Sequence, residues 1–214
     1  MDSGEWQWPT WRSLFHGAVR EALGAASSTA LLGVQDTHAW ELPMTYVVDD
    51  NQGNVGIAEF SPVGVIAAMS ARAPGRPFER THAISVAPPS VRDSLQRLCE
   101  APLLQEGMGV SALFWSTGEL IQCSESWAET WANGAEVFEQ ELLANPEWKV
   151  EGAEYYELTL EVCDLIIKVA ERAVVGTPIA RLSRRELTML IPPGSEHEHT
   201  AVDLLTSSRL FLVD

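Results

Sequence analysis

Apolar residues near the start of the chain recur at the spacing of an α-helix. Pro9 and Thr10 precede them and suit a helix start, because a Thr oxygen can cap free backbone N–H groups. The pattern predicts an amphipathic helix over 10–26, followed by a short strand over 30–34. The apolar positions of this helix are Trp11, Leu14, Phe15, Ala18, Val19, Ala22 and Leu23.

β-rich runs alternate with turn residues in the next part of the chain. The runs 44–49 and 55–60 flank a polar segment and predict a hairpin with a longer loop. Residues 110–115 and 119–123 predict a second hairpin around Ser116-Thr117-Gly118. Two further short strands are expected over 82–86 and 210–213.

Several later segments begin or end with residues that are typical of helix termini. Ser61-Pro62 suits a helix over 62–71, because the Ser oxygen can cap free N–H groups and Pro has none. Capping-box patterns occur at Ser90/Asp93, before a helix over 90–100, and at Ser183/Glu186, before a segment that Pro192-Pro193 ends. Further helices are expected over 124–144, which Asn145-Pro146 ends, and over 200–205.

Segment 153–175 fits two patterns at its start. Tyr156, Leu158 and Leu160 alternate with polar residues, as in a strand. A helical face that begins at Tyr155 extends further, to Ala173, and favours a helix.

The order of these elements mixes helices and hairpins without a regular strand–helix alternation. It favours an α+β fold, a single domain in which an antiparallel or mixed sheet with hairpins packs against several amphipathic helices. We expect an N-terminal Trp-containing arm over 1–9 and one α+β domain over 10–214.

The composition excludes several protein classes. The 214 residues are 46% apolar, which is enough to fill a core and excludes a disordered chain. The net charge of −16 argues against nucleic-acid binding, which needs clustered Lys and Arg. Three widely spaced cysteines and the absence of a signal-peptide pattern or a long apolar run predict a soluble cytoplasmic protein that neither spans nor binds a membrane.

The negative charge is concentrated in one segment. Residues 124–164 contain eleven acids and one base, Lys149, so these 41 residues carry −10 and the other 173 carry −6. Like charges at helical spacing repel. The excess of acids is explained either by solubility alone or by a surface for a basic protein partner.

Ten residues are the candidate partner-binding set. Trp6 and Trp8 belong to the N-terminal arm, where their indoles could pack on the body of the protein or on a partner. Three other tryptophans, Trp11, Trp127 and Trp131, have core spacing. The full set is Glu125, Glu129, Glu136, Glu139, Glu154, Glu157, Glu161, Asp164, Trp6 and Trp8.

Motifs for catalysis or for a cofactor are missing, so we expect no cofactor and assign no catalytic residue. The segment Glu196-His197-Glu198-His199 has four possible metal ligands, but it follows Pro192-Pro193 and is read as a polar loop rather than a metal site. The polar run 49–54 fails the pattern of a calcium loop and is explained as a hairpin loop.

Three functions remain. The first is an acidic inhibitor that binds a basic protein, in concrete form a bacterial immunity or antitoxin protein that neutralises a basic toxin. The second is a small enzyme with dispersed catalytic residues, drawn from His82, Cys123, Glu196 and His199. The third is a structural or adaptor subunit that docks through the Trp-containing arm.

Overall fold

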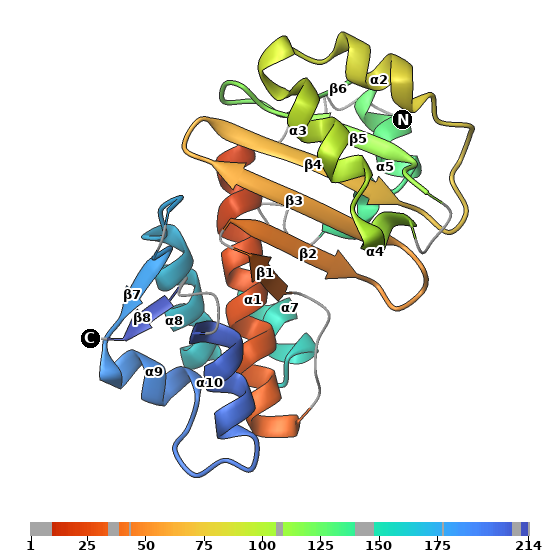
Figure 1. The fold of residues 1–214 in the computed structure, drawn as a ribbon. Coiled ribbons are helices and arrows are strands. Elements are labelled where there is room, and N and C mark those ends of the chain that lie inside the picture. The colour runs from red at the N-terminus through yellow and green to blue at the C-terminus, as the bar shows by residue number, and fades with distance from the viewer. Residues whose placement is uncertain are drawn as a thin grey trace, which may run out of the picture.

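The main feature of the computed structural model is an antiparallel sheet in the strand order β1-β2-β3-β4-β5-β6 (Figure 1). The structure describes residues 10–33, 39–42, 44–105, 109–139, 148–176, 178–206 and 211–213. The sheet and its packed helices confirm the α+β class. The strands are β1 Ala39–Leu42, β2 Thr45–Asp49, β3 Val55–Ser61, β4 Gly64–Ser70, β5 Ala112–Trp115 and β6 Gln122–Cys123. Both predicted hairpins, β2–β3 and β5–β6, are confirmed.

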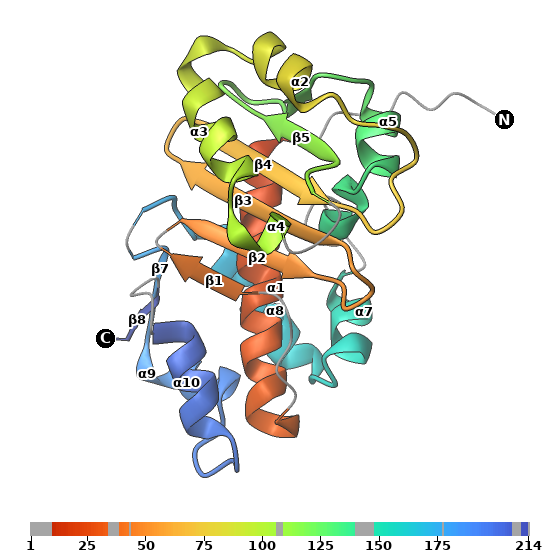
Figure 2. The ribbon, with the colours of Figure 1, turned by 45° about the vertical axis from the view of Figure 1, so that its right-hand side comes forward.

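Helix α1, Trp11–Leu32, packs against one face of the sheet (Figures 1 and 2). The Thr10 hydroxyl accepts a hydrogen bond from the Ser13 amide at 3.1 Å, as its capping role predicts. The expected helix is confirmed and is longer than 10–26. The strand expected over 30–34 is wrong for its first residues, because they continue α1 as far as Leu32; Val34 lies outside the described residues.

Three helices cover the opposite face: α2 Arg80–Val86, α3 Pro89–Cys99 and α4 Pro102–Gln105 (Figure 2). The strand expected over 82–86 is wrong, because this segment is α2, which packs on the sheet through Ala83 and Ile84. The helix expected over 90–100 is confirmed as α3. Its N-cap is Pro88 without a side-chain bond, so the expected capping box does not form.

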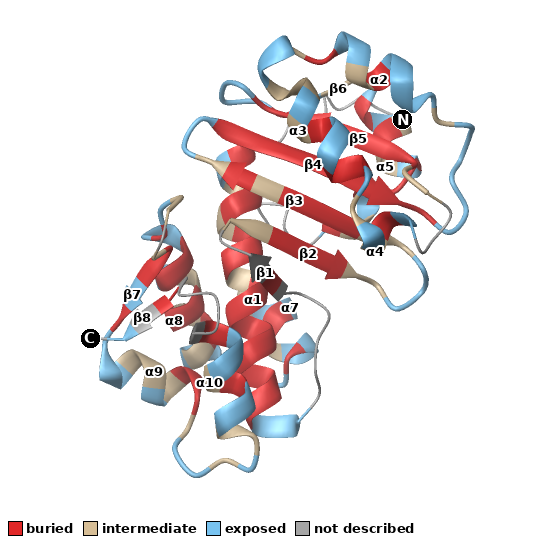
Figure 3. Ribbon diagram, in the orientation of Figure 1, coloured by how far each residue is buried: buried red, intermediate tan, exposed pale blue. Residues whose placement is uncertain are grey.

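Strand β4 occupies the segment for which the sequence predicts a helix over 62–71. Pro62 and Val63 form the turn of a hairpin in which Ser61 pairs with Gly64. All seven residues of β4 are buried (Figure 3). A central strand buried on both faces is apolar throughout, so it has no alternation that would distinguish it from a short helix.

The helix expected over 124–144 is interrupted. Helix α5, Trp127–Ala132, ends before Gly134, whose φ of 125° breaks the helix, and the short 3₁₀ helix η1, Ala135–Phe138, follows. Residues 140–147, which include the expected end at Asn145-Pro146, lie outside the described residues.

The helix expected over 153–175 is two helices, α7 Trp148–Tyr155 and α8 Leu160–Glu171. Glu157 has a φ of 54° in the break, and Thr159 caps α8 by accepting a hydrogen bond from the Val162 amide. Tyr156 and Leu158 are buried there. The acids of this segment therefore do not share one continuous helical face.

The C-terminal part adds a small parallel pair of strands and two helices beside α1 and α8. These are β7 Ala180–Leu182, α9 Arg184–Leu190, α10 Glu198–Thr206 and β8 Phe211–Val213. The structure confirms the Ser183/Glu186 capping box and the end of α9 before Pro192. It also confirms the helix near 200–205 and the final strand.

Apolar side chains form one cluster on each face of the sheet. Trp11 and Trp127 are buried in the α1-side cluster and Trp131 packs against it, as their spacing predicts. Among the described residues, no helix is long and apolar enough to cross a bilayer.

Candidate functional site: an acidic pocket

A pocket of about 480 Å³ lies where four segments far apart in the sequence meet: α1, the β2–β3 loop, η1 and α7. As far as the described residues define it, five acids line it and no Lys or Arg does. The lining residues are Glu21, Val48, Asp49, Asp50, Asn51, Gln52, Asn54, Glu136, Val137, Glu139 and Tyr155.

Glu21 supplies the buried wall of the pocket. Its carboxylate accepts a hydrogen bond from the indole nitrogen of Trp148 at 2.5 Å and another from the hydroxyl of Tyr156 at 2.8 Å. The Nε of Arg20 lies 3.5 Å from the same carboxylate, and its guanidinium stacks 4.9 Å from the Trp148 ring centroid. A buried carboxylate needs such partners, so Glu21 fixes α7 and the following break onto α1.

Two glycines allow the close packing that shapes the pocket. A Cβ at Gly24 of α1 would lie 2.6 Å from the Tyr156 ring, and one at Gly56 of β3 would lie 2.6 Å from the Phe138 ring. Both distances are shorter than any side chain tolerates. The missing side chains let α7 approach α1 and let η1 approach the sheet.

The β2–β3 loop forms a hydrogen-bonded rim. The Asp50 carboxylate accepts bonds from the amides of Gln52 at 2.7 Å and Asn54 at 2.9 Å, and Asp49 accepts one from the Asn51 amide at 2.8 Å. These bonds are typical of Asx turns and explain the polar run as a hairpin loop. They also hold both carboxylates at the pocket.

The opposite rim comes from η1 and α7. Glu136 and Glu139 are exposed there, and among the described residues no cation is paired with either. Tyr155 is 63% exposed and stands edge-on to Tyr156, with ring centroids 4.8 Å apart. The rim thus combines two unpaired carboxylates with an accessible aromatic ring.

The carboxylates of this lining are suited to binding a cation. Among its described residues there is no His, Cys, Ser or Thr, so a nucleophile or base here would have to be a carboxylate or Tyr155. Within the described residues, no three or more His, Cys, Asp or Glu side chains are grouped closely enough to hold a metal ion. A guanidinium or ammonium group fits the carboxylates, and Tyr155 can add a cation–π contact.

No protein-family model, curated protein or solved structure matches this chain. The chemistry of the pocket is therefore the basis on which a function can be argued.

Part of the candidate partner-binding set is neutralised within the protein. Arg76 forms ion pairs with Glu125 at 2.9 Å and with Glu129 at 2.7 Å. Glu129 also belongs to the α5 capping box, and hydrogen bonds from Ser126 lower the pKa of its carboxyl. Both glutamates therefore brace the loop 73–77 against α5.

The other members of the set are spread over several places. Glu136 and Glu139 line the pocket, while Glu154, Glu157 and Glu161 are exposed around the α7–α8 break. The remaining residues are Asp164, which pairs with Lys149 at 2.6 Å, and Trp6 and Trp8, which lie outside the described residues.

The His/Glu segment near the C-terminus has its own internal contacts. His199 lies on α10 and its Nδ1 is 3.0 Å from Asp203. The Glu198 carboxylate accepts a hydrogen bond from the Gly194 amide. The candidates for a dispersed active site are on separate elements, and within the described part of the chain no hydrogen bond or ion pair joins any two of His82, Cys123, Glu196 and His199.

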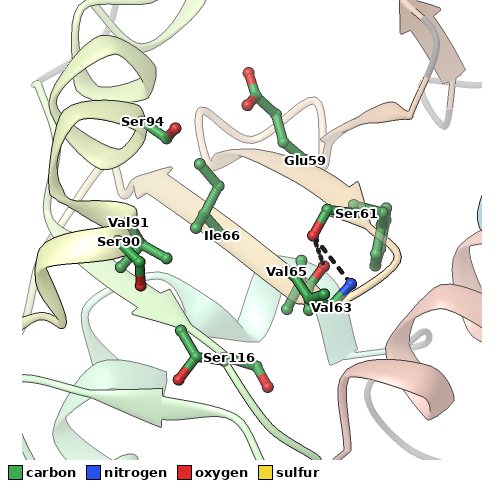
Figure 4. Close-up of a pocket in the computed structure, with 12 residues that line it drawn as sticks. Glu59, Ser61, Val63, Val65, Ile66, Ser90, Val91, Ser94 and Ser116 are labelled. Carbon is green, nitrogen blue, oxygen red and sulfur yellow. Dashed lines mark hydrogen bonds between the residues drawn. The ribbon is translucent and has the colours of Figure 1, made fainter.

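A second cavity, of about 410 Å³, lies between α3 and the β3–β4 hairpin (Figure 4). Two of its hydroxyl groups are engaged: Ser61 donates to the Gly64 carbonyl at 3.1 Å, and Ser116 to the Gly118 carbonyl at 2.5 Å. Its one carboxylate, Glu59, is held by both terminal nitrogens of Arg97 at 2.7 Å. No described residue of this lining forms a nucleophile–base pair.

Sequence reasoning missed Glu21, Asp49, Asp50 and Tyr155 as site residues. One signal was available, because Glu21 stands among the apolar positions of the first helix, where an acid is buried only with partners. The other three have no such signal, since polar loops and single aromatic residues are common.

Proposed function

We propose that this protein binds a basic protein and that the acidic pocket receives an Arg or Lys side chain of that partner. The observation that carries the proposal is the pocket itself: five acids and an exposed tyrosine line it, no described Lys or Arg is in the lining, and Glu21 alone of the five is paired with a described base, Arg20. Its volume is in the range of pockets that enclose a ligand group.

The charge of the whole chain supports the same proposal. With a net charge of −16, the molecule attracts positively charged proteins and speeds their association at low salt. Three further acids near Tyr155 in the chain, Glu154, Glu157 and Glu161, are exposed.

In its concrete form, the proposal is an inhibitor of the immunity or antitoxin type, acting in the cytoplasm. Toxins that cleave nucleic acids are basic because they grip phosphates. A protein that covers such a surface must present carboxylates in place of the phosphates. The acidic pocket supplies them on a rigid support.

Affinity capture from lysate of the source organism tests this function. The full chain is immobilised and captured proteins are identified at about 50 mM and about 500 mM salt. We expect one or a few specific proteins with net positive charge, bound at low salt and released at high salt. Capture of neutral or acidic proteins only, with no dependence on salt, would overturn the proposal.

A further inference from the structure

The cavity between α3 and the β3–β4 hairpin, which we call the α3 cavity, shares no lining residue with the acidic pocket. Its volume of about 410 Å³ lies within the range of sites that enclose a small ligand. Three segments far apart in the chain line it: the first turns of α3, the β3–β4 hairpin and the residues that follow β5. Ligand sites combine an apolar surface with a few polar groups, and this cavity has both.

The space exists because α3 carries small residues over this part of the sheet. Leu95 and Leu98, further along the helix, are buried in the apolar cluster on this face. The α3 residues that line the cavity are instead Ser90, Val91 and Ser94, whose shorter side chains leave a gap above the strands. Figure 4 shows these three residues on the helix side of the cavity, opposite the strands.

Strands β3 and β4 form the floor of the cavity. Glu59 and Ile66 are opposite each other in the β3–β4 ladder, so both side chains lie on the face of the sheet that α3 covers. At the hairpin turn, a Cβ at Gly64 would collide with the Ser116 carbonyl, so glycine lets the turn lie against the end of β5. The Ser116 amide donates to the Val65 carbonyl at 2.7 Å. The floor and one wall are therefore held by backbone contacts of the sheet.

The cavity contains a carboxylate that is already neutralised. The two oxygens of Glu59 each accept a hydrogen bond from Arg97 at 2.7 Å. Among the described residues, the lining contains no Lys, Arg or His and no acid besides Glu59. A cationic ligand would have to displace Arg97, and an anionic ligand would find no positive group in this lining. The cavity therefore fits a neutral ligand.

Hydroxyl groups from two sides of the cavity are available for hydrogen bonds to a ligand. Within the described part of the chain, no hydrogen bond engages the side chains of Ser90, Ser94 or Thr117. A hydroxyl group both donates and accepts, and the Glu59 oxygens keep lone pairs beyond those that Arg97 uses. These groups match a ligand that itself carries several hydroxyls, because such a ligand also needs both donors and acceptors.

We propose that the α3 cavity binds a small neutral polyhydroxy molecule, of the size of a monosaccharide or a cyclic polyol. Neighbouring hydroxyls of the ligand donate to the Glu59 carboxylate and exchange hydrogen bonds with Ser90 and Ser94. The carbon skeleton of the ligand packs on Ile66 and Val91, and burial of this apolar surface favours binding. The site does not depend on the function proposed for the acidic pocket.

Protein-observed NMR titrations with D-glucose, D-ribose and myo-inositol test the site. We expect at least one of these probes to give saturable shifts of the backbone amides in the first turns of α3 and in the β3–β4 turn. The dissociation constant should be in the millimolar range or lower. Inorganic phosphate is the charged comparison and should leave these amides unshifted. The proposal is overturned if none of the three probes gives saturable shifts at about 100 mM, or if phosphate alone binds there.

Filling the cavity should weaken this binding. Ser94→Leu places a larger apolar side chain in the cavity, so we expect the affinity for the bound probe to fall at least about tenfold. Gln96→Leu makes a similar change at an exposed position of the same helix and should stay within about threefold of wild type. Thr117→Val removes one hydroxyl outside α3 and should weaken binding severalfold. Affinity unchanged by Ser94→Leu, or by Thr117→Val where Ser94→Leu does not fold, would contradict the site.

Discussion

The indole nitrogen of Trp148 donates a hydrogen bond to the carboxylate of Glu21, a residue 127 positions earlier in the chain. This contact, together with the Tyr156 hydroxyl, ties α7 and the residue after it to α1 and holds Glu21, the buried member of the acidic pocket, in place. The pocket is therefore formed by tertiary structure and not by a local run of acids.

Removing the Glu21 carboxylate should destabilise the fold strongly. Glu21→Ala removes the carboxylate that accepts hydrogen bonds from buried Trp148 and Tyr156 and leaves a cavity between α1 and α7, so we expect the free energy of unfolding to fall by about 3 kcal/mol. Urea denaturation measures it. The exposed acid Glu154 is the matched control, and Glu154→Ala should change stability by less than about 0.5 kcal/mol. Equal effects of the two substitutions would contradict the structural role of Glu21.

The backbone at Glu157 predicts an unusual gain from glycine. Glu157 adopts a φ of 54° between α7 and α8, a conformation that glycine takes without strain. We expect Glu157→Gly to stabilise the protein by about 0.5 kcal/mol in thermal or urea unfolding. Glu154→Gly lies within α7 and should instead destabilise it by up to about 1 kcal/mol. A loss of stability at both positions would show that the positive φ is not maintained in solution.

The Arg172–Glu186 ion pair gives a dependence of stability on pH. Hydrogen bonds from Arg172, at 2.7 and 3.0 Å, lower the pKa of Glu186 from 4.5 to about 2. Because the folded chain takes up this proton at lower pH than the unfolded chain, the stabilisation is present above pH 4.5. It is lost as pH falls from there toward 2.

Comparison with Glu186→Gln isolates that contribution. The wild type should be more stable by roughly 1 kcal/mol at pH 6, a value reduced by the partial exposure of the pair. The difference should shrink as urea denaturation is repeated at successively lower pH. A difference that stays constant down to pH 3 would show that Glu186 titrates normally.

The elements predicted correctly are those whose ends are marked by capping or turn residues, or whose buried face is marked by the spacing of apolar residues. Thr10 and Ser183 cap helices α1 and α9, and the polar run between β2 and β3 forms a turn. Strand β4 was not predictable in the same way. It is buried on both faces, and the Ser61-Pro62 pair that resembles a helix start belongs to a hairpin turn.

The acidic pocket was predictable only in part. The excess of acids in 124–164 indicated a negative region, and Glu136 and Glu139 from it do line the pocket. The acids do not follow the two long helices expected over 124–144 and 153–175, because the chain breaks these helices at Gly134 and Glu157. Arg76 pairs with Glu125 and Glu129, and Asp49 and Asp50 line the pocket, because of contacts between residues far apart in the chain. No local sequence pattern predicts such contacts.

Binding of the captured partner to two charge-reversed variants tests the central claim most directly. The pocket variant combines Glu136→Lys with Glu139→Lys. The control variant combines Asp93→Lys with Glu100→Lys and changes the net charge by the same amount. Its two positions are exposed and lie in and just after α3, on the opposite face of the sheet. We predict that calorimetry gives a dissociation constant at least tenfold weaker for the pocket variant, and within threefold of wild type for the control. Equal weakening of both variants, or unchanged binding by the pocket variant, would contradict recognition through the pocket.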